Sequence, residues 1–265
     1  MPVAGEKYYF IGSLAKGIRI LELLVAQGEM TVTQVARHFG FNRVSCHRFL
    51  ATLKSLGYVE KDENNRYRPT FKMLELGMKV SGQFEIRQAA RPFMSELSEA
   101  SKETVNLGVL DGVDVLHIDK IDSLEILRMD SPIGSRAPVY CTALGKAILA
   151  YLPKDEFEKL LAKIKLKPSG PNTITTRKQF RSELEGIRAC GYAVDNQELT
   201  RGLRCVAAPI FDHTGRPRYA ISVSGPAERM TIARTEILQV QVRDVCKKIS
   251  RRMGQPSDLL ENNNQ

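Results

Sequence analysis

The stretch TVTQVARHFGFNRVSCHRFLATLKSLGYVEKDENNRYRP, residues 31–69, decides the fold of the first part of the chain. Thr31 or Thr33 is a suitable N-cap for a short helix, which ends at Gly40. Asn42 then caps a second helix, over residues 43–56. Two short helices joined through a glycine are typical of the helix-turn-helix, whose second helix enters the major groove of DNA. The stretch therefore predicts a DNA-reading motif.

The second of these helices has two chemically different faces. At about 100° per residue, its larger apolar side chains share one arc, which we expect to face the core: Cys46, Phe49, Leu50, Leu53 and Leu56. The opposite arc carries Val44, His47, Arg48, Ala51 and Ser55, with Arg43 and Lys54 at its edges. Small apolar side chains beside arginine suit a DNA groove, where they meet thymine methyl groups while arginine contacts guanine.

The flanking sequence completes a winged helix-turn-helix. Upstream, a helix is predicted from Ser13 to Gly28, and its one core-facing stripe is expected to contain Leu14, Ile18, Leu21, Leu24 and Val25. Downstream, residues 58–60 and 66–69 flank an Asn-Asn turn and predict a hairpin, or wing. Arg66 and Arg68 share one face of that hairpin, which points to contacts with phosphates or the minor groove. The alternative is a small helical domain whose basic residues form a solvated surface.

The distribution of charge favours DNA as the partner. The chain has 39 basic and 30 acidic residues, a net charge of +9, and its first 80 residues have 12 and 7, a net charge of +5. Residues 30–59 include no acidic residue. Nucleic-acid-binding proteins concentrate positive charge in this way. We expect Arg43, Ser45, His47 and Arg48 to read bases and nearby phosphates, and Thr33, Lys54, Arg66 and Arg68 to hold the DNA backbone.

Several protein classes are excluded by what the sequence lacks. It has no run of 18 apolar residues, and Glu6 and Lys7 interrupt the place of a signal peptide, so a cytoplasmic protein is expected without membrane contact. Five scattered cysteines show no metal-ligand spacing, so neither a disulfide framework nor a metal site is expected. No nucleotide-binding or hydrolase motif occurs, and we expect no catalytic residue and no cofactor.

The rest of the chain predicts an α+β domain built on an antiparallel sheet. Strands are expected at 104–110, 113–118, 124–129, 192–194, 204–211 and 218–224, and helices at 86–100, 142–151, 154–163, 177–190 and 234–253. The expected organisation is a DNA-binding domain over 10–70, a linker helix over 71–84, an effector-binding domain over 85–254 and a disordered tail over 255–265.

Two segments of the second domain carry patterns suited to a ligand. Strand alternation puts Ser222 and Ser224 on the same face of their strand. Thr142 caps a helix whose first turn is made of small residues, and such a helix start attracts carboxylates through its free N–H groups. Each pattern suits a binding site and plain scaffold equally well.

Two other function classes stay open at this point. One is a redox enzyme that uses the thiol of Cys141 or of Cys205, which follows Arg204, with the basic domain as a tether to nucleic acid. A cysteine in an apolar strand is more often a buried small side chain. The other is a structural DNA binder without ligand control, for which a second domain of some 170 residues would be large.

Three further stretches make the chain resemble the IclR family of bacterial transcriptional regulators. They are GSRAPVYCTALGKA at 134–147, GYAVDNQELTRGLRCVAAPIFD at 191–212 and AISVSGP at 220–226. The resemblance spans about 13–254 and includes LGYVEKDENNRYRPTFKMLELG at 56–77. It implies a winged helix-turn-helix, a GAF-like effector domain, and a repressor or activator that acts as a dimer or a dimer of dimers. A dimer would place two recognition helices on a palindromic operator.

The resemblance also implies the ligand and its contacts. Family members that bind small organic acids do so at positions matching Ala143, Leu144, Asp195, Cys205, Ser222 and Ser224, beside an apolar wall matching Ile126, Met129 and Leu203. The effector half is most similar to members that sense sugar-derived keto acids. The recognition helix, FNRVSCHRFL, departs from the Ser-Lys-Ser-Thr start of many relatives, although Arg48 matches a commonly basic position. No operator sequence therefore follows from the resemblance.

Overall fold

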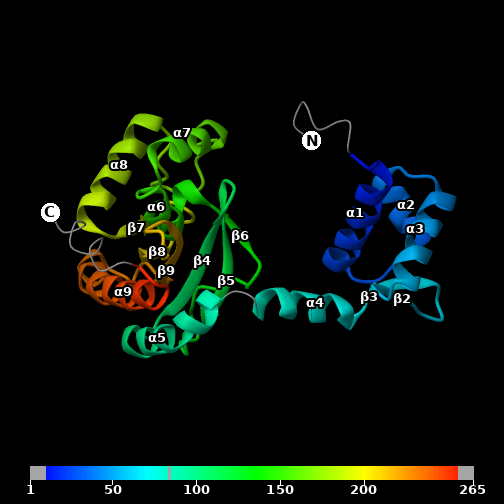
Figure 1. The fold of residues 1–265 in the computed structure, drawn as a ribbon, viewed down its shortest axis with the longest axis horizontal. Helices are drawn as coiled ribbons and strands as arrows, with labels where there is room; N and C mark the ends of the chain where they lie inside the picture. Colours follow the sequence, from blue (N-terminus) through cyan, green and yellow to red (C-terminus); the bar gives the residue numbers. More distant parts are fainter. Residues whose placement is uncertain (1–9, 83–84, 256–265) are drawn as a thin grey trace. The chain divides into compact units, whose positions relative to one another are not determined.

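A computed structural model describes residues 10–82 and 85–255 of the chain. The chain divides into two compact units, which separate between residues 84 and 85 (Figure 1). The first unit is mainly helical, and the second combines helices with an antiparallel sheet. The predicted α+β fold class is confirmed. The expected linker over 71–84 is a helix as far as residue 82, and its last two residues lie outside the described part.

The first unit is a winged helix-turn-helix. Its elements are α1 (Gly12–Gln27), β1 (Met30–Thr31), α2 (Val32–Phe39), α3 (Arg43–Ser55), β2 (Val59–Lys61), β3 (Arg66–Pro69) and α4 (Phe71–Gly82). Thr31 caps α2, because its hydroxyl accepts from the Gln34 N–H at 3.3 Å while the Gln34 side chain accepts from the Thr31 N–H at 2.8 Å. The Asn42 side chain caps α3 by accepting from the Val44 N–H. Thr33 therefore lies inside α2, and the predicted wing is present.

The wing has one strand more than the sequence pattern indicates. The two-residue β1 pairs antiparallel with β3, which gives the strand order β1-β3-β2. Met30 faces Tyr67 across this pair. The extra pairing ties the turn before α2 to the wing, so that the recognition helix and the wing share one small framework.

The predicted core of this unit holds for α3 but not for α1. Ile20, Leu24, Val35, Cys46 and Leu50 are fully buried. The other predicted positions of the α1 stripe behave differently: Leu14, Ile18 and Val25 are 60%, 48% and 56% exposed. The helix has two apolar stripes, and periodicity alone does not tell which stripe faces the domain's own core.

The second unit is a six-stranded antiparallel sheet covered on both faces. Its elements are α5 (Glu85–Ser101), β4 (Thr104–Asp111), β5 (Asp114–Ile121), β6 (Arg136–Pro138), the 3-10 turn η1 (Val139–Cys141), α6 (Ala143–Leu149), α7 (Lys154–Lys163), α8 (Arg177–Cys190), β7 (Ala193–Asn196), β8 (Leu203–Phe211), β9 (Pro217–Pro226) and α9 (Ile232–Arg252). The strand order is β6-β5-β4-β9-β8-β7, and all neighbours are antiparallel.

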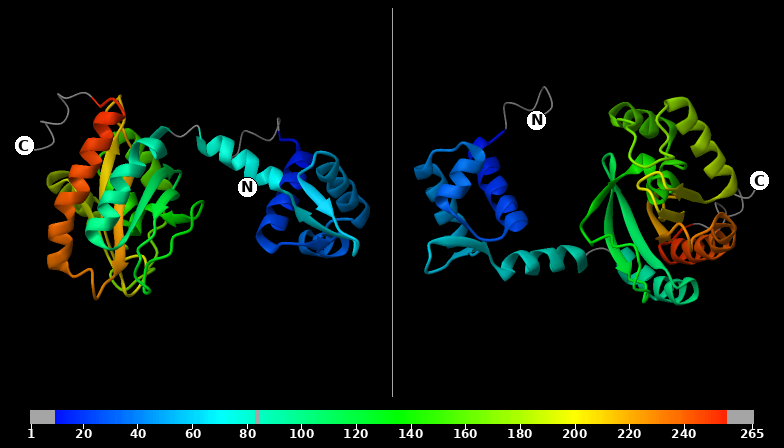
Figure 2. Two further views of the ribbon diagram at one scale, coloured as in Figure 1. Left: turned by 90° about the horizontal axis from the view of Figure 1, so that it is seen from below. Right: turned by 180° about the vertical axis from the view of Figure 1, so that it is seen from behind.

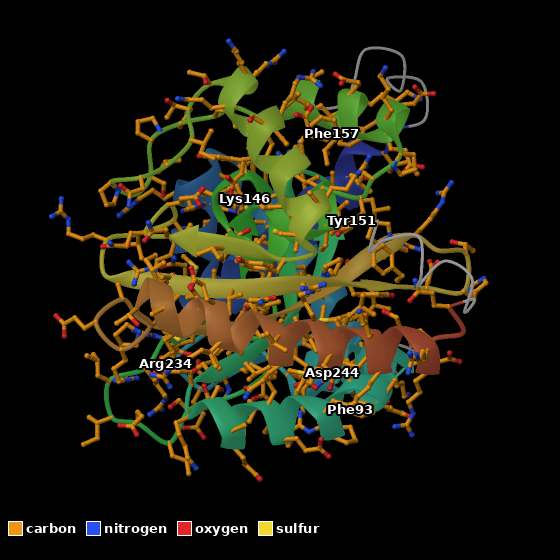
Figure 3. All side chains as sticks on the ribbon, turned by 90° about the vertical axis from the view of Figure 1, so that its left-hand side faces the viewer. Phe93, Lys146, Tyr151, Phe157, Arg234 and Asp244 are labelled. Carbon is orange, nitrogen blue, oxygen red and sulfur yellow. The ribbon has the colours of Figure 1, made fainter. Side chains whose placement is uncertain are left out.

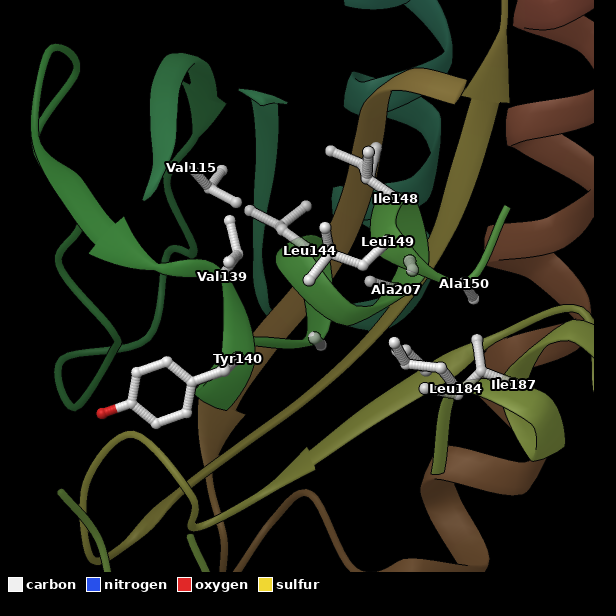
Figure 4. Packing of buried hydrophobic residues seen from close by; sticks show 14 of the residues in the cluster. Val115, Val139, Tyr140, Leu144, Ile148, Leu149, Ala150, Leu184, Ile187 and Ala207 are labelled. Carbon is white, nitrogen blue, oxygen red and sulfur yellow. The ribbon is translucent and has the colours of Figure 1, made fainter. Parts of the chain in front are cut away.

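Two layers of helices enclose the sheet. Helices α5 and α9 lie side by side on one face (Figures 2 and 3). Helix α6 lies on the other face, where its residues Leu144 and Ile148 pack among sheet side chains and α8 backs it with Leu184 and Ile187 (Figure 4). Strand β8 is covered on both sides, which explains its continuous apolar sequence.

One predicted strand, residues 124–129, is wrong. The segment is an irregular loop between β5 and β6, and the side chains of Leu124 and Ile126 are 100% and 99% exposed. The short strand β6 takes the free edge of β5, so the alternating apolar residues of this loop have no strand to pair with. The expected tail lies outside the described residues except for Gln255, which is buried and donates its N–H to the Ser250 carbonyl at 3.0 Å.

Candidate DNA-binding face and ligand cavity

The outward face of α3 is basic and unobstructed. Its predicted base-reading residues are all exposed: Arg43, Ser45, His47 and Arg48. Val44, also on this face, is 70% exposed. Within residues 10–82, Arg43, Arg48 and Lys54 take part in no ion pair, so their charges are available to an anionic partner. A groove-binding helix needs this combination of free cations and small apolar groups.

The arginines of the wing are exposed but already paired. Arg66 contacts Glu29 at 2.9 Å, and Arg68 contacts Glu60 at 2.6 Å. Pairs this exposed contribute only about 0–1 kcal/mol each, so a phosphate group can displace the carboxylate. Thr33 is exposed on α2. All eight predicted DNA-contact residues are therefore accessible within the first unit.

A small cavity lies in the second unit, between the start of α6 and the sheet. Fourteen residues line it: Asn106, Val115, His117, Met129, Ser131, Thr142, Ala143, Leu144, Asp195, Leu199, Leu203, Cys205, Ser222 and Ser224. Its volume is about 30 Å³, which holds about two water molecules. Nine of the ten predicted effector residues line it, and Ile126 does not.

The register of the sheet brings the polar wall of this cavity together. Asp195 pairs with Cys205, Cys205 with Ser224, and one pair further along Ser222 pairs with Asn106. Side chains two residues apart on a strand point to the same face. The Asn106 amide donates to Ser224 Oγ at 3.2 Å, and the two serine hydroxyls lie 3.3 Å apart. A continuous polar network thus crosses β4 and β9.

The start of α6 forms the facing wall. Thr142 caps the helix by accepting from the Gly145 N–H at 3.2 Å, while its hydroxyl donates to the Pro138 carbonyl at 3.0 Å. A Cβ on Gly145 would lie 2.2 Å from the Val139 carbonyl oxygen, so only glycine lets η1 pack this closely. The first N–H groups of a helix have no partner within it. With seven residues, α6 is shorter than predicted.

Asp195 is the one carboxylate in the cavity wall among the described residues, and it is 1% exposed. Its Oδ1 accepts from the N–H groups of Glu198 at 2.7 Å and Leu199 at 3.4 Å. Burial raises the pKa of Asp195 to about 7 against the opposing effect of these hydrogen bonds. Near neutral pH the group is partly protonated, which lessens its repulsion of an anionic ligand.

A buried ion pair supports the loop that holds Asp195. Lys146 is fully buried on α6, and its ammonium donates to Glu198 and, at 2.7 Å, to Glu183. Burial alone would lower the pKa of Lys146, but the two carboxylates outweigh it and raise that pKa. The Lys146–Glu198 contact thereby fixes the backbone that donates to Asp195.

The thiols weigh against redox or nucleophilic chemistry. Cys141 and Cys205 are buried, and burial raises the pKa of Cys141 to about 12 and that of Cys205 further still. A thiol this weakly acidic supplies almost no thiolate at neutral pH. Over residues 10–82 and 85–255 no group of His, Cys, Asp and Glu is arranged to hold a metal ion, and no helix is long and apolar enough to cross a membrane.

Comparison with known proteins identifies the family. Residues 13–63 match the IclR helix-turn-helix domain, and residues 78–251 match the C-terminal domain of bacterial transcriptional regulators of the IclR type. The second match alone covers more than half of the chain. The chain belongs to the IclR family.

Similar regulators and structures extend over nearly the full length. The HTH-type transcriptional regulator KdgR of Escherichia coli is 36% identical over 245 residues, 92% of this chain and 93% of the relative. XynR of the same organism, another HTH-type transcriptional regulator, is 34% identical over 249 residues, 93% and 99% of the two chains. The crystal structure of the Thermotoga maritima IclR has a TM-score of 0.79 at 35% identity, covering 92% and 100%. This IclR-family chain is a DNA-binding regulator of transcription.

Sequence reasoning missed five residues of the IclR-family cavity. They are Asn106, Val115, His117, Ser131 and Leu199. The alternation predicted over 104–110 already places Asn106 on the same face as every second neighbour, but nothing in the sequence indicates that this face turns toward the serines. That information lies in the β4–β9 pairing, between residues more than a hundred positions apart.

Proposed function

We propose that this IclR-family regulator binds a small organic acid in the cavity between α6 and the sheet, and that the bound acid changes its affinity for DNA. The observation that carries the proposal is the buried polar network of Asn106, Ser222 and Ser224 opposite the start of α6. Buried hydroxyls beside a helix start and a partly protonated Asp195 suit a carboxylate with further oxygen atoms. The resemblance to members that sense sugar-derived keto acids supports this ligand class.

Nine predicted residues form the proposed site, and each has a part in it. Thr142, Ala143 and Leu144 orient the acid group, Asp195, Ser222 and Ser224 hydrogen-bond it, and Met129, Leu203 and Cys205 supply the apolar wall. A coupling free energy of about 1–3 kcal/mol between the two sites suffices for a 5- to 150-fold change in DNA affinity. No catalytic residue, cofactor or metal has a role in this proposal, which also places the protein in the cytoplasm with its DNA.

On the DNA side, we propose a palindromic operator read by two copies of the chain. The exposed apolar stripe of α1, with Leu14, Ile18 and Val25, supports a dimer joined through this helix. Arg43, Ser45, His47 and Arg48 read each half-site, and Thr33, Lys54, Arg66 and Arg68 hold its backbone. A pair of such dimers is the larger assembly that the family resemblance implies.

The test uses the full chain and a DNA site selected by the protein from random sequences. Fluorescence anisotropy then measures operator affinity with and without a panel of carboxylic, oxo and sugar acids. Ser222→Ala should leave operator binding intact and raise the half-effective acid concentration 5- to 150-fold, since a buried hydrogen bond of about 1–3 kcal/mol is lost. Ser182→Ala, at an exposed serine of α8, is the matched control. A response that persists unchanged in Ser222→Ala would exclude this cavity as the effector site.

A further inference from the structure

Two polar side chains of the cavity each have a buried atom without a hydrogen-bond partner. Asn106 on β4 is 1% exposed, and His117 on β5 is 8% exposed. In the described part of the chain, nothing pairs with Asn106 Oδ1 or His117 Nδ1. Buried polar atoms in folded proteins are nearly always paired, so two unpaired atoms in one cavity wall point to a ligand that completes them.

The two side chains occupy a part of the cavity distinct from its acid-binding end. They come from β4 and β5, whereas the proposed acid-binding residues come from α6, β7, β8 and β9. His117 pairs with Gly108, two residues along β4 from Asn106. Glycine is required between them, because a Cβ at position 108 would lie 2.5 Å from Val115 and 3.0 Å from Leu144. The apolar side chains thus close in at Gly108 and leave Asn106 and His117 as the polar groups of this wall.

The unpaired atoms require a hydroxyl group. The Asn106 amide is engaged through Nδ2 with Ser224 Oγ, which leaves its carbonyl oxygen to accept a hydrogen bond. Burial, and more weakly Lys120, lowers the pKa of His117, so the imidazole is neutral and has one donor and one acceptor nitrogen. Carboxylate and keto oxygens only accept. A hydroxyl donates and accepts, so it satisfies the amide in either orientation and the imidazole in either tautomer.

We infer that the effector is a polyhydroxylated acid, and that Asn106 and His117 bind hydroxyl groups along its carbon chain. The two residues thereby select it against unsubstituted oxo acids of the same length, because such acids leave both polar atoms unpaired. This inference rests on the proposed function, since it takes the cavity as the effector site and assigns the chemistry of its second end.

Isothermal titration calorimetry on the full chain tests the inference with two sets of probes. The first set is D-gluconate and 2-oxo-D-gluconate, and the second is 2-oxohexanoate and pyruvate, which carry no hydroxyl groups. We expect at least one acid of the first set to bind at least tenfold more tightly than both acids of the second. Asn106→Leu and His117→Phe should each reduce this preference at least fivefold, while 2-oxohexanoate binds as well as before or better. His213→Phe, at an exposed histidine of the same unit, should change nothing.

The outcomes separate this inference from the proposed function. Equal binding of the two sets, as expected if water satisfies Asn106 and His117, overturns the inference alone. Unchanged preference in both variants has the same meaning. If no probe of either set binds or alters operator affinity, the inference and the proposed effector site fail together. A variant that loses binding to 2-oxohexanoate as well has lost the cavity's structure, and the other variant then decides.

Discussion

At the scale of single residues, the side chains that matter most are those whose charge has no partner. Arg48 is exposed on α3 without an ion pair in the described part of its unit, whereas Arg68 of the wing is held by Glu60. A free guanidinium on the groove-facing side can grip a base edge with two hydrogen bonds. A guanidinium on a hairpin strand reaches the sugar-phosphate backbone instead.

Arg48→Ala should therefore weaken binding to the selected operator by about 1–3 kcal/mol and binding to random DNA much less. Arg68→Ala should weaken both by similar factors and reduce the salt dependence of binding. Competition anisotropy at several salt concentrations measures both effects. Equal losses on operator and random DNA for Arg48→Ala would make it a phosphate contact rather than a base-reading residue.

Asp195 should make ligand affinity depend on pH. Because burial raises its pKa to about 7, the group loses its proton as pH rises through 7, and its negative charge then repels a bound carboxylate. Acid binding should weaken from pH 6 to pH 8. Asp195→Asn retains an acceptor for the Glu198 N–H and should flatten this profile, which calorimetry at three pH values can measure. A wild-type profile as flat as that of the variant would contradict the assignment.

The same shift has a consequence for stability of known sign. A folded-state pKa above the unfolded one means that the native state binds more protons, so stability falls as pH rises from about 4 to about 7. A rise from 3.8 to about 7 corresponds to about 4 kcal/mol at most. Buried His117, whose pKa is lowered, acts in the opposite direction near pH 6.5. Comparing the urea unfolding of Asp195→Asn and wild type isolates the aspartate.

At the scale of elements, the contact between η1 and α6 is the most exacting in the second unit. Gly145→Ala introduces a Cβ only 2.2 Å from the Val139 carbonyl oxygen and 2.4 Å from its Cα, so backbone must move. We expect a loss of about 1–3 kcal/mol or more, seen as a lower melting temperature, together with weaker ligand binding.

Helix α8 offers a matched control for this substitution. Gly186 lies inside that helix, and a Cβ there meets nothing within 4 Å. Gly186→Ala should stabilise the unit by about 0.5–1 kcal/mol, because alanine loses less conformational freedom in a helix. Equal melting temperatures for the two alanine variants would show that η1 yields without cost.

The elements that local sequence predicts well are those with a complete local signal. Helices α7 and α8 have the predicted bounds, and α8 is bounded by a capping Thr176 and by Gly191 in the left-handed conformation. The loop at 124–129 alternates like a strand, but pairing depends on a neighbour, and β6 occupies that edge. The α1 stripe has helical spacing, but which face meets the core depends on tertiary packing. Likewise, the polar cavity required the β4–β9 register.

At the scale of the whole molecule, the exposed stripe of α1 is the surface whose role extends beyond one chain. Leu14→Glu should abolish dimers in analytical ultracentrifugation and reduce operator affinity, while the melting temperature stays close to that of wild type because Leu14 is 60% exposed. Gln27→Glu places the same charge at an exposed polar site of the same helix and should leave the dimer intact. A dimer that survives Leu14→Glu would move the interface away from α1.

The small volume of the cavity has a consequence for kinetics. A space of about 30 Å³ admits no organic acid, so binding must wait until part of the wall moves. Met129 and Ser131 belong to the loop between β5 and β6, where Leu124 and Ile126 are almost fully exposed and anchor little. Apparent affinity is then the affinity of the open state scaled by how often it is populated. In stopped-flow mixing, the observed rate should level off as ligand concentration rises, at the opening rate of this loop. Natural variation in the loop could thus retune the regulator's sensitivity without altering any residue that touches the ligand.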